Sequence, residues 1–356
     1  MHVTSVVGAR PQFIKLAAVA AALDRAGITH SIIHTGQHYD TNMSDVFFDE
    51  LAIPVADVNL DVGSGSHAVQ TGAMLPGLED HFQRLSPDWV LTYGDTNSTI
   101  AAALAAVKIH LPTAHLEAGL RSFNRRMPEE HNRVLTDHAS DLLLAPSDVA
   151  VENLGHEGLA ERTVHVGDVM VDIALLVQRA LDPDAPALPD GVDGVDGYVL
   201  ATIHRAETTD EPERLAATLA ALQAMPVPVV LPAHPRLRAR AAEHGLALER
   251  DSLHVVDPLP YRAMVAAVTG ARAVVTDSGG LQKEAFVLGT PCTTVRTETE
   301  WTETVDLGWN VLVRTTAELV DLPAIVLRRP PPPTDDAPYG RGDAADRVAE
   351  VLASGP

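Results

Sequence analysis

Short β-branched runs alternate with longer alanine- and leucine-rich stretches along this chain, and the alternation leaves few folds open to it. Val3–Val7 precedes a helical pattern over Phe13–Ala26, and Trp89–Tyr93 precedes one near Ser98–Lys108. Such alternation predicts a parallel sheet with helices on both faces. Two further strands are expected in this part of the chain, at Ser31–His34 and Thr113–Leu116.

The pattern starts again in the second half of the chain, after a segment rich in proline, glycine and aspartate at Leu181–Gly197. The 356 residues also exceed what one hydrophobic core usually holds. We therefore predict two parallel α/β domains with a junction near Gly167–Asp172, and a last helix over Asp343–Ala353. The strands expected in the second domain are Tyr198–Ile203, Val227–Leu231, Leu253–Val256, Ala273–Thr276 and Cys292–Val295.

Charge and cysteine content exclude several classes of protein. The chain has 26 basic and 48 acidic residues, a formal net charge of −22, and a field of that sign repels nucleic acid and anionic membranes. Its single cysteine, Cys292, excludes an internal disulfide. No stretch approaches the ~20 apolar residues of a membrane span, and the first residues lack a signal-peptide pattern, so a cytoplasmic protein is expected.

Polar clusters follow the predicted strands one after another. Ligands of open parallel sheets bind beyond the carboxyl ends of the strands, and two such domains that face one another form a cleft. These clusters therefore predict a polar cleft. They are Gly8–Pro11, Gly94–Thr96, Glu117–Arg121, His204–Glu207, Asp277–Gly280 and Arg296.

Two of these clusters have the composition of a phosphate site. Ser278-Gly279-Gly280 opens an expected helix, where glycines allow close approach of an anion and the helix end favours negative charge. The alternative is a serine N-cap with glycines for a tight turn. Arg10 and Lys15 could reach phosphate oxygens from the first helix, or they are ordinary surface charges. Glu284, one turn beyond Gly280, is either a ribose ligand or a solvated residue.

Carboxylates in the first half are the candidates for acid–base chemistry. They are Asp95, Glu117 and the pair Glu129-Glu130. A carboxylate at the floor of a cleft can have a pKa suited to proton exchange. Asp95 could instead cap the following helix, and Glu129 could be a first-turn carboxylate after Pro128. Glu117 has no helix to cap, because Ala-Gly follows it.

The histidines do not have the spacing of a metal site. There are sixteen of them, but His115, His131, His138, His204 and His234 form no H-E-x-x-H or comparable pattern, so no metal is expected. His204, next to Arg205 and directly after a strand, is the best functional candidate among them.

Taken together, these residues resemble the UDP-N-acetylglucosamine 2-epimerase family over nearly the whole chain. The matching segments are GARPQFIK at 8–15, TGQHYD at 35–40, YGDTNST at 93–99, HLEAGLRS at 115–122, MPEEHNR at 127–133, IHRAE at 203–207, DPLPY at 257–261, DSGGLQKEA at 277–285 and YGRGDAADR at 339–347. Their joint occurrence in this order is far more specific than any one of them.

The resemblance implies an α/β GT-B fold, with two Rossmann-like parallel-sheet domains that face a cleft. It implies an N-terminal domain at 1–168 with the catalytic carboxylates, a UDP-binding domain at 169–340, and a terminal helix at 341–356 that returns to the first domain. The implied catalytic residues are Asp95, Glu117, Glu129 and His204. The implied substrate-binding residues are Arg10, Lys15, Arg133, Arg205, Ser278, Gly279, Gly280 and Glu284.

The implied reaction is inversion at carbon 2 of a UDP-N-acetylhexosamine. No carbonyl neighbours that carbon, so plain deprotonation is implausible, whereas departure of UDP from carbon 1 allows proton removal and leaves a 2-acetamidoglucal. Protonation on the other face and return of UDP complete the inversion. The steps need proton-handling groups on both faces, and cations with helix-end amides at the diphosphate. No cofactor is needed, and the expected partners are a UDP-sugar and a second copy of the chain in a homodimer.

Three segments bear on the branch and the substrate. Gly94-Asp95-Thr96 resembles the non-hydrolysing branch of the family, because the hydrolysing branch typically has arginine where Thr96 stands. Trp301 stands where a basic residue near the diphosphate is common, and Gln37–Met43 differs from the motif of members that their own substrate activates. The sugar is therefore UDP-N-acetylglucosamine or a related UDP-sugar such as a 2,3-diacetamido-hexuronate.

Two other functions fit the same phosphate cradle. A UDP-sugar-dependent GT-B glycosyltransferase would share the fold but needs an acceptor groove and no cluster of carboxylates around carbon 2. A non-catalytic UDP-sugar sensor would share the pocket. Only an epimerase forms a new UDP-sugar without an acceptor.

Overall fold

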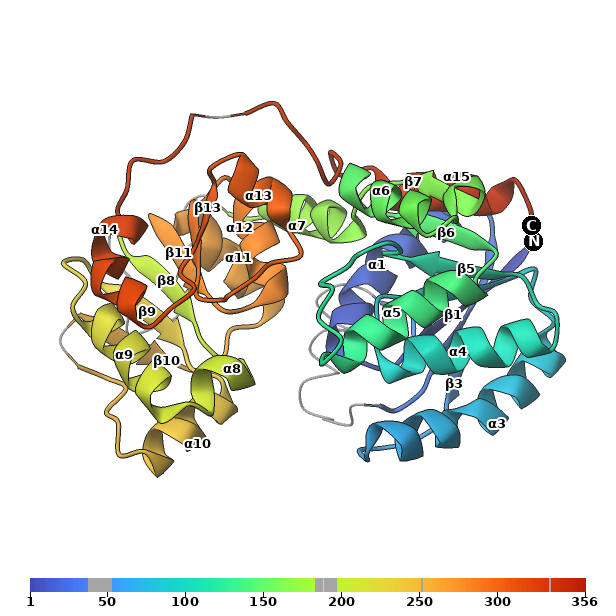
Figure 1. Cartoon of the computed structure of the whole chain (residues 1–356). Helices are drawn as coiled ribbons and strands as arrows, with labels where there is room; N and C mark the ends of the chain where they lie inside the picture. The colour runs from blue at the N-terminus through green and yellow to red at the C-terminus, as the bar shows by residue number, and fades with distance from the viewer. Residues whose placement is uncertain (38–52, 183–187, 189–196, 251, 333) are drawn as a thin grey trace. The chain divides into compact units, whose positions relative to one another are not determined.

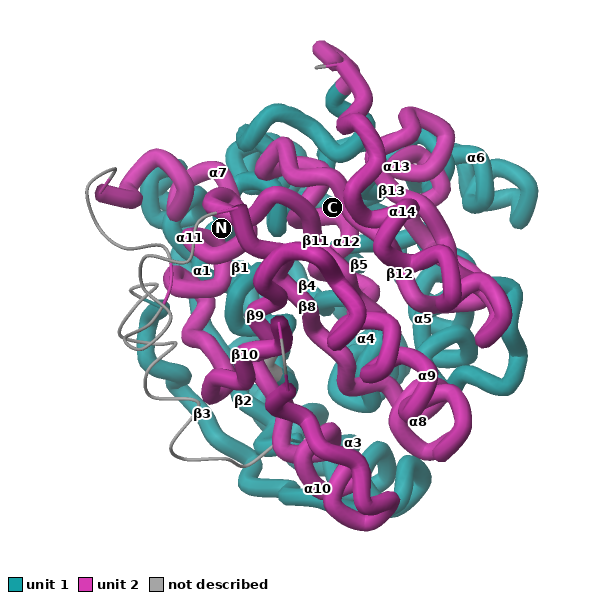
Figure 2. The backbone as a smooth tube through the Cα atoms, turned by 90° about the vertical axis from the view of Figure 1, so that its left-hand side faces the viewer, with its two compact units in different colours: residues 1–173, 337–356 teal, residues 174–336 magenta. Residues whose placement is uncertain are grey.

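Two parallel sheets organise the chain in a computed structural model, which describes residues 1–37, 53–182, 188, 197–250, 252–332 and 334–356, without the side chain of Arg10. The chain divides into unit 1, residues 1–173 with 337–356, and unit 2, residues 174–336 (Figure 2). The boundaries expected from the sequence, after residues 168 and 340, remain a proposal beside this division. Each sheet belongs to one unit.

The sheet of unit 1 has seven parallel strands in the order β3-β2-β1-β4-β5-β6-β7. Its direction of growth reverses between β1 and β4, which is where the ligands of such sheets bind. The strands are β1 (His2–Val7), β2 (Thr29–His34), β3 (Val58–Asn59), β4 (Trp89–Tyr93), β5 (Thr113–Leu116), β6 (Leu142–Ala145) and β7 (Thr163–His165).

Helices lie along both faces of this sheet (Figure 1). The helices of unit 1 are α1 (Arg10–Arg25), α3 (His67–Leu85), α4 (Asn97–Lys108), α5 (Pro128–Ala139), α6 (Asp148–His156), the 3-10 helix η1 (Ala160–Arg162) and α15 (Ala344–Ala353). Helix α7 (Val169–Arg179) begins in unit 1 and ends in unit 2. Helix α4 packs closely because alanines occupy its buried face, and Met74 and Phe82 of α3 fill the space beside it.

The six-stranded sheet of unit 2 has the Rossmann order, β10-β9-β8-β11-β12-β13, and is also parallel. Its strands are β8 (Val199–Thr202), β9 (Val229–Pro232), β10 (Leu253–Val256), β11 (Ala273–Thr276), β12 (Cys292–Thr294) and β13 (Asn310–Leu312). Its helices are α8 (Ala206–Thr209), α9 (Pro212–Gln223), α10 (Pro235–Glu243), α11 (Tyr261–Gly270), α12 (Gly279–Val287), α13 (Thr302–Asp306), η2 (Ala317–Asp321) and α14 (Leu322–Val326). The predicted α/β class with two parallel sheets is confirmed.

Local sequence explains where the helices nearest the strand ends begin. Thr96 caps α4 by accepting a hydrogen bond from the Thr99 backbone N–H. At the start of α1, the Gln12 amide oxygen accepts from the backbone N–H groups of Gly8 (2.8 Å) and Ala9 (3.0 Å). The Gln12 amide group also donates to the carbonyl of Tyr93 (2.7 Å), which ties the start of α1 to the end of β4. Within the described residues, no helix is long and apolar enough to cross a membrane.

The last helix, α15, belongs to unit 1 and packs against α1. Its first N–H groups, those of Ala344 and Ala345, donate to the Asp172 carboxylate at 3.2 and 2.7 Å. Burial raises the pKa of Asp172 from its ordinary value of 3.8 to about 6, with Asp168 and Asp343 adding to the rise and the two N–H groups opposing it. The Asp172 carboxylate therefore links the two chain segments of unit 1, and its protonation changes near pH 6.

We expect this contact to make stability depend on pH. Because the pKa of Asp172 is raised in the folded state, folded protein holds a proton between pH 4 and 6 that the unfolded chain has already lost. The contribution of Asp172 to the free energy of unfolding therefore falls as pH rises through that window. Urea unfolding at a series of pH values should show that the free energy of unfolding of Asp172→Asn lacks this decrease. Plots of that free energy against pH that stay parallel for the variant and the unaltered protein from pH 4 to 6.5 would contradict the prediction.

Candidate active site

The carboxylate of Glu117 lies at the carboxyl end of β5 in an unusual backbone conformation. Its φ is +74°, which is uncommon for any residue but glycine, and the N–H groups of Glu117 and Ala118 donate to the carbonyl of Leu144 on the next strand (3.1 and 3.2 Å). Such strain persists only where the surroundings fix it, and it is concentrated at functional sites.

Glu117 forms an ion pair with Lys15 of α1. The two side chains are 13% and 10% exposed, so the pair is largely shielded from water. Burial alone would lower the pKa of Lys15, but the charge and hydrogen bond of Glu117, together with Asp168 and Asp95, raise it above its ordinary value. Lys15 is therefore a stable cation at this site, and the alternative of an ordinary surface charge is wrong.

The turn after β4 approaches this pair closely. Gly94 has a φ of +60°, and a Cβ on it would lie 3.2 Å from Glu117 Oε2 and 3.4 Å from Lys15 Nζ. A Cβ at position 94 would be tight against the Glu117 carboxylate and would have a strained φ, so this turn favours glycine. Asp95 directly follows Gly94, and its charge contributes to the raised pKa of Lys15.

Asp95 is held by α5 and does not cap α4. Its carboxylate pairs with Arg133, and its carbonyl accepts from the Asn132 amide at 2.9 Å. Thr96 is the N-cap of α4, so the capping alternative for Asp95 is wrong. Arg133 also donates to Glu130 at 3.1 Å. One face of α5 therefore fixes the Asp95 turn.

The neighbouring glutamates of α5 have different surroundings. Glu130 is buried and accepts from the N–H groups of Ser122 (3.0 Å) and Phe123 (2.9 Å), so it stabilises a loop. Glu129 is exposed and lines a pocket with Asp95. Of the pair, Glu129 is therefore the one available to a substrate. It also lies in the first turn of α5, as the alternative prediction stated.

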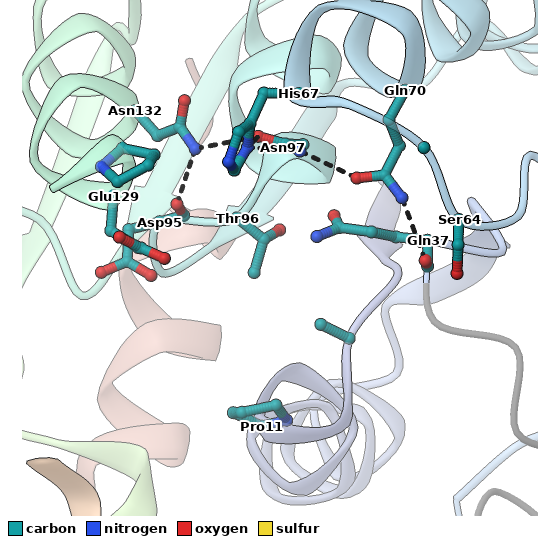
Figure 3. Close-up of a pocket in the computed structure, with 13 residues that line it drawn as sticks. Pro11, Gln37, Ser64, His67, Gln70, Asp95, Thr96, Asn97, Glu129 and Asn132 are labelled. Carbon is teal, nitrogen blue, oxygen red and sulfur yellow. Dashed lines mark hydrogen bonds between the residues drawn. The ribbon is translucent and has the colours of Figure 1, made fainter. Parts of the chain in front are cut away.

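This pocket has a volume of about 350 Å³ and is lined mostly by polar side chains (Figure 3). Amide groups bridge its walls: Gln70 donates to the carbonyl of Gln37 (3.0 Å), and Asn97 donates to Gln70 (2.8 Å). The sequence analysis missed these amides, because glutamine and asparagine carry no motif that separates binding from structural use. Thr96 lines the same pocket.

Unit 2 has a second polar constellation where β8 and β11 end. Asp277, fully buried, accepts from the backbone N–H groups of His204 (3.0 and 3.1 Å) and Arg205 (3.0 Å). His204 Nδ1 also lies 3.5 Å from Asp277 Oδ1. Asp277 thus joins the loop after β8 to the start of α12, a role that the sequence analysis did not predict.

Helix α12 begins where two guanidinium groups converge. Ser278 is its N-cap, as the alternative prediction stated, and accepts from the Leu281 N–H. A Cβ on Gly279 would lie 3.4 Å from the Arg205 guanidinium and 3.8 Å from that of Arg296. The exposed N–H groups of a helix end and two cations form a site suited to a diphosphate.

Carboxylates and a lysine surround this cradle. Glu300 pairs with Arg296 through both oxygens (2.9 and 3.1 Å), and although burial opposes it, Arg296 lowers the pKa of Glu300. Glu284 is buried and accepts from the Tyr261 hydroxyl at 3.2 Å, which contradicts its alternative as a solvated residue. Lys283 is buried and lies over the ring of Trp301, 4.0 Å from the ring centroid. A cation therefore lies beside Trp301, the residue that replaces a basic residue of the family motif.

The structure thus gathers the predicted site residues into two sets. Unit 1 brings together Lys15, Asp95, Glu117, Glu129 and Arg133, and unit 2 brings together His204, Arg205, Ser278, Gly279, Gly280 and Glu284. Arg10 begins α1, but its side chain lies outside the described part of the structure. Residues 38–43 of the segment that was compared with the motif of substrate-activated members also lie outside it. Among the described residues, no three His, Cys, Asp or Glu side chains gather to hold a metal ion.

Comparison with known proteins gives consistent results. Residues 21–353 match the family model described as UDP-N-acetylglucosamine 2-epimerase. The chain is 47% identical to a UDP-2,3-diacetamido-2,3-dideoxy-D-glucuronate 2-epimerase of Pseudomonas aeruginosa, over 99% of each chain. It is 38% identical to a UDP-N-acetylglucosamine 2-epimerase of Methanocaldococcus jannaschii, over 100% of each.

Solved structures agree along the whole chain. The crystal structure of Methanocaldococcus jannaschii UDP-GlcNAc 2-epimerase in complex with UDP-GlcNAc and UDP has a TM-score of 0.89 at 37% identity and covers 100% of both chains. The Neisseria meningitidis UDP-GlcNAc 2-epimerase bound to UDP-GlcNAc has a TM-score of 0.86 at 28% identity and covers 99% of this chain and 100% of the other.

Proposed function

This chain belongs to the UDP-N-acetylglucosamine 2-epimerase family, and we propose that it is the non-hydrolysing type of isomerase, which inverts carbon 2 of a UDP-bound 2-acetamido sugar. The observation that carries the proposal is the pair of cation–carboxylate contacts at the ends of the neighbouring strands β4 and β5, Arg133–Asp95 and Lys15–Glu117. Elimination and re-addition need several carboxylates beside one carbon atom, whereas glycosyl transfer does not.

The residues have the following roles in the proposal. A carboxylate among Asp95, Glu117 and Glu129 removes the proton from carbon 2 while the bond between carbon 1 and the bridging oxygen breaks. The bonding electrons leave with UDP, and a double bond forms between carbons 1 and 2. A second carboxylate then delivers a proton to the other face, and UDP adds back to carbon 1. Lys15 and Arg133 contact Glu117 and Asp95 and so hold these two side chains in place.

UDP is proposed to bind unit 2 at the start of α12. The backbone N–H groups at Gly279 and Gly280, with the Arg205 guanidinium, would take the diphosphate. Glu284 would accept from ribose hydroxyls, and His204, hydrogen-bonded to the buried Asp277 through its backbone, would face the leaving oxygen as its acid. The charge that develops on UDP is then stabilised by groups that are already oriented before the reaction.

The sugar is proposed to be UDP-N-acetylglucosamine or a UDP-2,3-diacetamido-hexuronate. The 47% identity to an epimerase of the second kind and the 38% identity to one of the first support testing both. The homodimer and the cytoplasmic location stay predictions, which light scattering and cell fractionation can check.

Isotopic labelling tests the reaction itself. In heavy water, with each UDP-sugar and no acceptor, we expect a new UDP-sugar that carries deuterium at carbon 2, and the recovered substrate should also acquire it. An oxygen-18 label between carbon 1 and phosphorus should move to the non-bridging oxygens of the same phosphate, because the bond breaks reversibly. Nuclear magnetic resonance detects both changes.

The same experiment separates the rival functions. A glycosyltransferase or a sensor would form no new UDP-sugar under these conditions. Retention of the original hydrogen at carbon 2 after full equilibration would refute elimination even if the epimer formed.

A further inference from the structure

Behind the carboxyl ends of β4 and β5 lies a buried charged cluster that the proposed chemistry does not use. His115 of β5 and Asp137 of α5 are both fully buried, and the Arg121 side chain is 1% exposed. Charged groups are rarely enclosed in this way unless they are paired and hydrogen-bonded, because removing a charge from water is costly. The contacts of this cluster indicate what it does.

The contacts of the His115 ring determine its protonation. Its Nε2 lies 2.7 Å from the carbonyl oxygen of Gly94, which can only accept a hydrogen bond. Its Nδ1 lies 2.6 Å from Asp137 Oδ1. Because Asp137 Oδ2 accepts from the Gly119 N–H (3.1 Å) and from Arg121 (2.8 Å), this carboxylate is surrounded by donors and is ionised. The ring therefore donates from both nitrogens and carries a positive charge.

The Asp137 carboxylate agrees with this arrangement. Burial alone would raise its pKa, but the charges and hydrogen bonds of His115 and Arg121 lower it below the ordinary value. Arg121 is in turn held by Glu157 at 2.7 and 2.8 Å. The cluster is thus a chain of alternating charges that runs from the Gly94 carbonyl to Glu157.

The segments that the cluster fixes are those that carry two of the proposed proton-transfer groups. Asp137 bonds to His115, Gly119 and Arg121, and so it holds the chain on both sides of Glu117. Through the His115 ring it also holds Gly94, the residue immediately before Asp95. Neither Asp137 nor His115 contacts the two carboxylates themselves in the described hydrogen bonds and ion pairs.

Holding these two turns has an energetic reason. The left-handed φ of Glu117 is strained and would relax if the loop were free. The Gly94 carbonyl, fixed by His115, sets the direction in which the chain enters Asp95. Arg133, one turn before Asp137 on α5, holds the Asp95 side chain itself. One helix therefore controls both turns.

We propose that the buried Asp137–His115 pair is a positioning device that keeps the Glu117 and Asp95 carboxylates at the separation required on the two faces of the sugar ring. The proposal rests on the proposed function for the meaning of those carboxylates. Its structural half, a doubly protonated His115 that binds Gly94, does not depend on that function.

The first test is spectroscopic and uses the full chain without substrate. Nitrogen-15 spectra of the imidazole rings at pH 7 should contain one fully cationic ring, identified as His115 by its loss in His115→Gln. In Asp137→Asn this signal should become that of a neutral ring. A neutral His115 in the unaltered protein would overturn the proposal, whatever reaction the protein catalyses.

The second test separates positioning from stability. In His115→Gln and Asp137→Asn we expect kcat to fall by about 10- to 100-fold, because misplacement of a reacting group by ~1 Å costs a factor of that order. KM and the Kd for UDP should change by less than about threefold, since UDP is proposed to bind unit 2. The fraction of turnovers that release 2-acetamidoglucal should rise, and this ratio does not depend on how much enzyme is folded.

Controls distinguish the possible failures. Asp172→Asn neutralises another carboxylate that accepts backbone N–H groups in unit 1 and should keep both kcat and the release ratio. If either variant folds poorly, the release ratio of the folded fraction still gives the answer. Unchanged kcat per folded molecule with an unchanged ratio would refute positioning, whereas an unaltered protein without epimerase activity would refute the proposed function and leave the spectroscopic test standing.

Discussion

Replacing Glu117 by glutamine is expected to lower kcat by about 10²- to 10⁴-fold, the range that one positioned acid–base group contributes. Glutamine keeps the shape of glutamate, so the φ of +74° and the contacts of the loop are retained. It cannot accept or deliver the proton. Lys15 loses its main partner but still faces Asp168 and Asp95, so the local charge does not become unpaired.

Binding measurements should separate the lost chemistry from lost structure. We expect calorimetry to give a Kd for UDP within about threefold of the unaltered protein, because UDP is proposed to bind the other unit. Asp172→Asn is the matched control, an isosteric neutralisation of a carboxylate in the same unit that accepts from backbone N–H groups at the start of α15. If Glu117→Gln kept kcat within tenfold, Glu117 would not be the proton-transfer group.

The fold was predictable from the sequence where strands are β-branched and flanked by turns. The predicted strands Trp89–Tyr93, Thr113–Leu116, Leu253–Val256 and Ala273–Thr276 coincide with β4, β5, β10 and β11. Four strands were missed. β6, Leu142–Ala145, is composed of leucine and alanine and has no β-branched residue, so its sequence favours a helix. β3, β7 and β13 have two or three residues each, too few for any periodicity.

The site was predictable as a set of positions but not as a set of contacts. The rule that ligands bind beyond strand ends selected Asp95 and Glu117 as candidates, and the structure places them after neighbouring strands because β4 and β5 pair in parallel. Their partners, Lys15 and Arg133, lie 102 and 38 residues away, and no local pattern shows which cation meets which carboxylate. Surface charge and buried ion pair have the same sequence signature.

Side-chain environment decided the remaining alternatives. Glu129 and Glu130 are adjacent and identical in type, and only the helix geometry sends one into the pocket and the other into the loop. Likewise, the segment HLEAGLRS does not show that His115 pairs with Asp137, because the role of this pair depends on the bonds of Asp137 to residues 16 to 22 positions earlier in the chain.

A valine at Gly279 is expected to weaken UDP binding by about 10- to 100-fold, the second large effect. The residue begins α12, and its Cβ position lies 3.4 Å from Arg205 and 3.8 Å from Arg296, in the space where a diphosphate would meet both the helix end and the cations. The methyl groups of valine would fill that space and keep the phosphate from the backbone N–H groups.

Comparison within the series distinguishes this obstruction from damage to the helix. Gly279→Ala adds only a Cβ, for which ordinary contact distances remain, so its Kd should lie between those of Gly279 and Gly279→Val. Gly280→Val places the same side chain one residue later, where nothing lies within 4 Å, and should cost similar helix stability with a smaller loss of affinity. Thermal unfolding measures the loss of helix stability, and calorimetry with UDP measures the loss of affinity. Equal affinities across the series would mean that these glycines serve only the turn and that UDP binds elsewhere.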